Sequence, residues 1–147
     1  MEALQLRVKD LDFGYQGIHV HNAKGAKDRV VTFPKILHPA VHLHLGSVRR
    51  LHALDLKDGY GSVYLPYALA RKYRSAAAEW KWHHLFPAAR LSVDPRSGAT
   101  RRHHMLPSTF QKAIRTAVLK AGVSKPASSH SLRHSFATLL LKTASTF

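Results

Sequence analysis

A histidine and an arginine near the C-terminal end of the sequence, His130 and Arg133, have the residue types and the spacing for phosphate chemistry. The segment after Pro126 predicts a helix, and residues three apart on a helix project from the same face. An imidazole exchanges protons near neutral pH, and a guanidinium makes two parallel hydrogen bonds to phosphate oxygens. The pair therefore predicts proton transfer at a phosphodiester whose developing charge the arginine stabilises.

The net charge of the chain indicates what it binds. Among 147 residues, 23 lysines and arginines face 8 acidic residues, for a formal charge of +15. Charge on this scale favours nucleic acid over an acidic protein or a membrane surface, because binding releases the counterions of the polyanion. Better solubility is the alternative explanation of the charge.

The composition also bears on where the chain works. No apolar run approaches the length of a membrane span, and the first residues do not have the pattern of a signal peptide. The chain has no cysteine, which excludes disulfides and thiolate metal sites and fits a reducing compartment. We therefore expect a cytoplasmic, DNA-associated protein that does not enter a membrane.

The elements that must position these side chains follow from the residue pattern. Alternating residues predict a strand at 18–21, a turn around Gly25 and a returning strand at 29–33. A helix is predicted over residues 40–52, and a second one runs from Pro66 through Trp82. The buried face of the first helix is expected to comprise Val41, Leu45 and Val48.

Two more helices are predicted in the last third of the chain. Ser108 is the expected N-cap of a helix over residues 109–120, which Gly122 ends. The last helix carries His130 and Arg133. The side chains expected to be buried are Phe110, Ile114 and Val118 on the first of these helices, and Leu132, Phe136, Leu139 and Leu140 on the second.

The whole string from His130 to Thr138, HSLRHSFAT, resembles the second signature box of the tyrosine recombinases, and the resemblance is closest to the integron integrases. It implies an α+β fold, a mainly helical catalytic domain with a small antiparallel sheet. Residues 1–147 would then form a partial catalytic domain truncated at both ends, without the N-terminal core-binding domain. The implied reaction is site-specific strand exchange by cofactor-free transesterification, catalysed by a tetramer on DNA.

The resemblance also implies roles for individual residues. Lys24, at the tip of the predicted hairpin, matches the general acid, and its ammonium could donate a proton to a leaving alkoxide. Without the resemblance, such a basic turn could equally be an ordinary solvated loop. His130 would be the acid and base, and Arg133 would stabilise the phosphorane.

Two catalytic groups of the family have no counterpart at the expected place. Residues 6–12 look like the end of the first signature box, whose glutamate would be Glu2, and the arginine of that box would precede Met1. All five tyrosines lie before His130, whereas the nucleophilic tyrosine of the family follows the second box. We therefore expect that this chain alone neither cleaves nor joins DNA.

The segment at 64–104 looks like the insertion that distinguishes integron integrases, which act on folded single-stranded cassette sites and on duplex integration sites. Matched residue by residue, Trp82 with Pro95 would hold one protruding base, and His103 with His104 would hold a second. Aromatic rings are suitable stacking surfaces for unpaired bases, although either Trp80 or Trp82 could instead belong to the core. The basic residues expected to contact DNA phosphates are Lys27, Arg29, Arg101 and Arg102.

Two other classes of protein are compatible with the composition. A non-catalytic basic module could bind nucleic acid with the same charge. Twelve histidines, with doublets at 83–84 and 103–104, suggest zinc, but no cysteine or carboxylate is placed to complete a site. We therefore predict no metal site and no cofactor.

Overall fold

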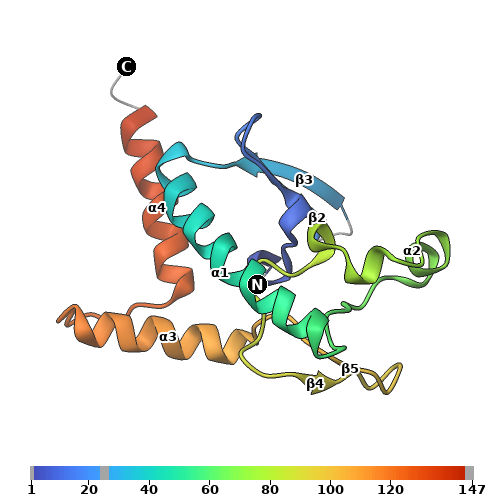
Figure 1. The fold of residues 1–147 in the computed structure, drawn as a ribbon. Helices are drawn as coiled ribbons and strands as arrows, with labels where there is room; N and C mark the ends of the chain where they lie inside the picture. The colour runs from blue at the N-terminus through green and yellow to red at the C-terminus, as the bar shows by residue number, and fades with distance from the viewer. Residues whose placement is uncertain (1, 24–26, 145–147) are drawn as a thin grey trace. The chain divides into compact units, whose positions relative to one another are not determined.

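The computed structural model describes residues 2–23 and 27–144, whose contacts group into two compact units, Met1–Met105 and Leu106–Phe147 (Figure 1). Both strands and helices are present, and the sheets are small and antiparallel, so the predicted α+β class is confirmed. The prediction of a single partial catalytic domain stays a prediction.

A three-stranded antiparallel sheet forms one part of the first unit, with β1 at Leu11–Asp12, β2 at Gly17–Ala23 and β3 at Lys27–Thr32, in that order. Ile18 pairs with Val31, and the register shifts between Val20 and Ala23. The predicted hairpin is confirmed, whereas its turn, with Lys24 and Gly25, lies outside the described residues. Val20 packs with Leu6 and Leu85 in the core, because alternate residues of a strand face the same side.

The long helix α1, His38–Lys57, extends further at both ends than the sequence predicted. Pro39 lies in its first turn, where a missing N–H costs no helical hydrogen bond. Its buried residues are Val48, His52 and Asp55, whereas Val41 and Leu45 are half-buried. The helix ends before Gly59, whose φ is +82°.

The predicted helix from Pro66 through Trp82 is wrong for most of its length. The structure has a short α2, Tyr67–Lys72, followed by single 3-10 turns at Ala76–Ala78 and Trp80–Trp82. The chain leaves helical geometry at Tyr73 and turns back, which buries Ala76 against Val63 and Leu65. Burying this small cluster outweighs the helical propensity of the alanine run.

Backbone pairing away from the main sheet fixes the middle of the chain. The amide of Val8 donates to the carbonyl of His83, and the amide of Leu85 donates to the carbonyl of Leu6. Two backbone bridges lie along this segment, one between Arg7 and His84 and one between Pro87 and His104. Residues 83–88 therefore connect the N-terminal segment to the segment that carries His103 and His104. A two-stranded sheet, β4 at Ser92–Val93 and β5 at Thr100–Arg101, closes the first unit.

The second unit comprises α3, Pro107–Lys120, and α4, Ser129–Ala144. The N-cap of α3 is Leu106 rather than the predicted Ser108, because Pro107 occupies the first helical position. Gly122 follows the helix with a φ of +64°, as its predicted role as the stop requires. The side chain of Gln111 donates to the hydroxyl of Ser129, which connects the two helices.

Burial on these two helices is lower than the sequence predicted. Phe110, Ile114 and Val118 are half-buried. Leu132 and Phe136 are each 59% exposed and Leu139 is 62% exposed, so the predicted burial of these three is wrong for this unit. A pair of helices has too little apolar surface to cover every side of either one. The side chain of Leu140 lies outside the described part.

Candidate nucleic-acid interface

A cavity of about 770 Å³ in the first unit brings together most of the residues that the sequence singled out for base recognition. We call it the tryptophan cavity. Trp82, His103 and His104 all line it, whereas Pro95, the predicted partner of Trp82, is exposed and is not among its lining residues. The other side chains that give it polar and charged character are Glu2, Gln5, Arg7, Lys9, Asp10, His21, Asp28, Tyr64, His84 and Arg96.

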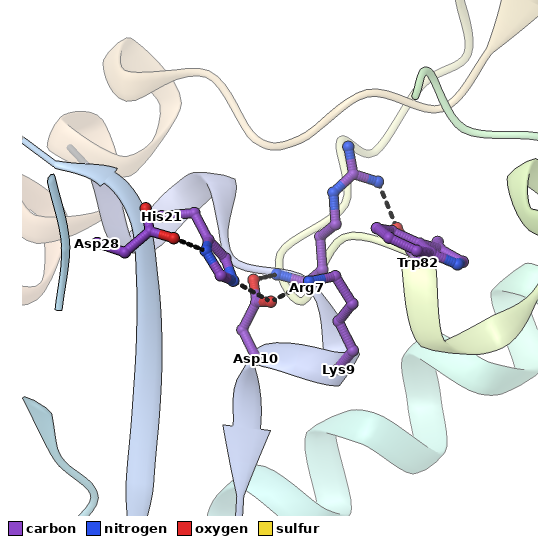
Figure 2. Close-up of polar contacts among 6 residues, drawn as sticks. All are labelled: Arg7, Lys9, Asp10, His21, Asp28 and Trp82. Carbon is purple, nitrogen blue, oxygen red and sulfur yellow. Dashed lines mark hydrogen bonds and ion pairs between the residues drawn. The ribbon is translucent and has the colours of Figure 1, made fainter. Parts of the chain in front are cut away.

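Trp82 is half-buried, and both its backbone and its ring are held in place (Figure 2). Nη1 of Arg7 donates to the carbonyl of Trp82 at 2.5 Å, and Nη2 of Arg7 donates to the carbonyl of Tyr64 at 2.9 Å. The ammonium of Lys9 lies 4.8 Å from the centroid of the indole ring, a cation–π geometry. The indole Nε1 is buried and makes no hydrogen bond within the described residues.

Besides His21, three histidines line the cavity, namely His84, His103 and His104. His84 and His104 meet edge to face, with ring centroids 5.5 Å apart, and Nδ1 of His104 lies 3.0 Å from the carbonyl of Met105. Nδ1 of His84 and Nε2 of His103 are buried and lack hydrogen-bond partners among the described residues. Burial, followed by the charge of Arg7, lowers the pKa of His84 to about 3, so this ring is neutral at physiological pH.

A chain of polar contacts links the segment of Lys9 and Asp10 to the β2–β3 hairpin (Figure 2). Nδ1 of His21 lies 2.8 Å from Asp28, across the hairpin, and Nε2 of His21 lies 3.5 Å from Asp10. Asp10 is 4% exposed, pairs with Lys9 at 3.1 Å and accepts the backbone N–H of Arg7. The side chain of His21 therefore joins the hairpin to the segment of Arg7 and Asp10, which also contacts Trp82.

Two of the four basic residues that were predicted to contact DNA phosphates, Lys27 and Arg29, lie at exposed positions on this hairpin. Arg29 pairs with Glu2 at 2.5 Å, and the hydrogen bond and charge of Glu2 raise the pKa of Arg29. The structure thus joins the glutamate assigned to the first signature box to the hairpin that includes Lys24.

Arg102 is placed differently from the sequence prediction. It is 7% exposed, and its Nε and Nη2 donate to the carboxylate of Asp55 at 2.5 and 2.7 Å. Nη1 donates to the carbonyls of Ala88 and Ala89, each at 2.9 Å. With its donors used inside the fold, Arg102 makes no phosphate contact in this arrangement, and the prediction is corrected to a structural ion pair between α1 and the segment beside His103.

The second unit holds the other part of the predicted chemistry. His130 and Arg133 lie in the first turns of α4 and are both exposed, as an interface with a phosphate requires. Nε2 of His130 lies 2.8 Å from Nε2 of His134, one helical turn further along. The hydroxyl of Ser128 accepts the backbone N–H of Ser131 at 3.3 Å, which caps the start of the helix beside His130.

Sequence reasoning missed several residues that build this interface, namely Arg7, Lys9, Asp10, His21, Asp55 and His84. A signal existed for His21, since it alternates with His19 along a predicted strand opposite Asp28. The others act through contacts between segments that are far apart in the chain. Within residues 2–23 and 27–144, no three histidines or carboxylates are grouped to hold a metal ion. No helix in that part of the chain is long and apolar enough to cross a membrane.

Comparisons with known proteins show the family of this α+β fold. The chain belongs to the phage integrase family, the tyrosine recombinases, whose pattern matches residues 1–145. It is 49% identical over 141 residues to an "Integrase/recombinase" from Escherichia coli, and equally to one from Pseudomonas aeruginosa. Each match covers 96% of this chain and 42% of the relative, so the chain spans less than half of their length.

A solved structure supports the same assignment. The crystal structure of XerA recombinase matches with a TM-score of 0.56 and 28% sequence identity. The match covers 97% of this chain and 37% of the XerA chain. The α+β arrangement described above is therefore that of a tyrosine recombinase.

Proposed function

We propose that this chain is the DNA-contacting part of an integron-type integrase catalytic domain, and that its parent protein recombines gene cassettes through a phosphotyrosine intermediate. Its DNA partners would be folded single-stranded cassette sites and duplex integration sites, bound by a tetramer of the parent. The observation that carries the integron assignment is the shared placement of Trp82, His103 and His104 around one cavity.

The chemistry of the tryptophan cavity suits an unpaired nucleobase. Its volume of about 770 Å³ lies in the range of small-ligand pockets, and an indole offers a stacking surface to any base. The unpartnered ring nitrogens of Trp82, His84 and His103 are buried, and a buried donor or acceptor without a partner is destabilising. The edge of a base carries donors and acceptors that could pair with them. Arg96 adds positive charge for an attached phosphate, whereas Arg7 and Lys9 already bond to the carbonyls of Trp82 and Tyr64 and to Asp10.

In the proposed reaction, Lys24 protonates the leaving alkoxide, His130 transfers protons at the phosphate, and Arg133 stabilises the charge of the phosphorane. The i, i+3 spacing and the exposure of His130 and Arg133 support these roles. In a chimera in which the 141 aligned residues replace those of the E. coli relative, Lys24→Ala, His130→Ala and Arg133→Ala should each abolish recombination. Full activity of any of the three variants would remove that residue from the mechanism.

The base-recognition role is tested by binding. Trp82→Ala should weaken binding to a hairpin with protruding bases by about 1–3 kcal/mol and leave binding to perfect duplex nearly unchanged. Fluorescence anisotropy with the two labelled DNAs measures the difference. Tyr15→Ala is the matched control, because Tyr15 is 94% exposed and does not line the cavity. Equal losses on both DNAs would show that Trp82 only supports the fold.

A further inference from the structure

A second cavity in the first unit, of about 670 Å³, has three arginines in its wall. We call it the arginine cavity. Arg71 lies on α2, Arg74 follows that helix, and Arg101 lies on β5. None of the described residues that line it is acidic. Because like charges gather there without a carboxylate in the wall, the cavity selects for an anion.

Arg101 supplies a second, independent observation. Its Nε is buried and has no hydrogen-bond partner among the described residues. The nearby carboxylate of Asp94 lies 3.9 Å from Nη1, at the outer limit of an ion pair, and Asp94 also accepts bonds from the backbone of Arg96 and the hydroxyl of Ser97. A charged donor that is buried without an acceptor destabilises the fold more than a neutral donor does. A bound oxyanion would accept a hydrogen bond from Nε and remove this destabilisation.

Apart from the hydroxyls of Ser97 and Tyr64, the rest of the lining is apolar. Val63 and Leu65 belong to a buried cluster and Ala77 packs on it. Tyr64 also lines the cavity, and the guanidinium of Arg96 lies 4.9 Å from the centroid of its ring. Inorganic phosphate would make no favourable contact with these apolar side chains, whereas a nucleotide carries a base that can pack on them beside its charged phosphate. The volume is sufficient for a single nucleotide.

We propose that the arginine cavity binds one nucleotide of a single DNA strand, with its phosphate on Arg71, Arg74 and Arg101 and its base over Val63, Leu65 and Tyr64. Tyr64 lines both cavities, so they are neighbours and one strand can occupy the two in succession. The proposal rests on the proposed function, in that the ligand is single-stranded DNA, and it goes beyond the sequence prediction for Arg101 by adding Arg71, Arg74 and an apolar surface for the base.

The test keeps the net charge constant. Arg71→Lys combined with Arg74→Lys retains both charges and removes the planar forks that hold a phosphate by two bonds. We expect the affinity for a fluorescein-labelled oligothymidylate to fall about tenfold. The control pair Arg90→Lys and Arg115→Lys, at exposed positions outside the cavity, should bind as the unaltered chain does. Equal affinity of the two double variants would overturn the proposal.

A second variant and a competition assay complete the test. Ala70→Glu places a carboxylate in the wall on the exposed α2, and it should reduce binding further while leaving the thermal melt unchanged. Thymidine monophosphate should compete better than inorganic phosphate. Equal competition by the two would overturn the role of the apolar side chains. If the unaltered chain binds no DNA at low salt, the proposed function fails, whereas unaltered binding by the cavity variants defeats this inference alone.

Discussion

The two units of the chain hold their functional residues in opposite ways. In the first, Trp82 and His84 are held by the hydrogen bond from Arg7 and by the backbone bridge between Arg7 and His84. In the second, His130 and Arg133 stand exposed on a helix whose apolar residues are also exposed. Side chains that are held in place suit the recognition of a base by its shape. Exposed side chains on a helix suit a reaction at a phosphate, because bound DNA places its phosphates at the protein surface.

The largest effect is expected where the first unit is most buried. Asp55→Ala leaves the guanidinium of Arg102 buried and uncompensated, so it should lower the free energy of unfolding by about 3–5 kcal/mol. Urea unfolding followed by tryptophan fluorescence measures it, since both tryptophans belong to this unit. Glu2→Ala breaks the exposed pair with Arg29 and should cost at most about 1 kcal/mol. Similar losses of unfolding free energy in the two variants would contradict the claim that the buried ion pair stabilises the fold more than the exposed one.

Acid should destabilise the first unit more than the second. Burial lowers the pKa of His83 to about 4 and that of His84 to about 3, below the ordinary value of 6.5. Between pH 6.5 and 4 the unfolded chain therefore binds more protons than the folded one, and stability is lost as the pH falls. The loss for each histidine is about 3 kcal/mol at pH 4.

The measurement is urea unfolding followed by tryptophan fluorescence at a series of pH values. His83→Asn should flatten the profile, whereas His19→Asn, at an exposed position on β2, should leave it unchanged. Stability of the first unit that is constant from pH 7 to pH 4 would contradict the burial of the two histidines.

The smallest effect is expected on α4. Phe136→Ala should change stability by less than about 1 kcal/mol, because that ring is 59% exposed. Phe33→Ala removes a ring that is 1% exposed and should cost about 3–5 kcal/mol. Hydrogen exchange measures the two effects separately: the amides of α4 report on the Phe136 variant, and those of α1, whose His38 contacts the ring of Phe33, report on the Phe33 variant. A large loss of protection in α4 of the Phe136 variant would mean that this ring is buried in solution.

Local pattern was sufficient for part of this fold. The hairpin at β2 and β3, the end of α3 at Gly122 and the start of α4 all follow from turn, cap and alternation signals within a few residues. The predicted helix through the alanine run is wrong because the burial of Ala76 against Val63 is decided by contacts between distant segments. Arg102 illustrates the same limit, since nothing in the sequence places Asp55, 47 residues away, beside it.

The site was predictable to a similar extent. The string from His130 to Thr138 indicated the family, and the tryptophan and histidine doublet of the middle segment pointed to residues that do share a cavity. Pro95, the predicted partner of Trp82, is not among the residues that line this cavity. The positions of Arg7, Lys9 and His84 depend on the backbone pairing between residues 6–8 and 83–85, which the sequence did not predict.

The most direct test of the account is photocrosslinking of this chain to a cassette-type hairpin that carries 5-iodouracil at a protruding position. The account predicts crosslinks in the peptides that contain Trp82 or residues 103–104, and far fewer from a perfect duplex with the same label. Crosslinks confined to the second unit, or an equal yield from the duplex, would contradict base recognition in the tryptophan cavity.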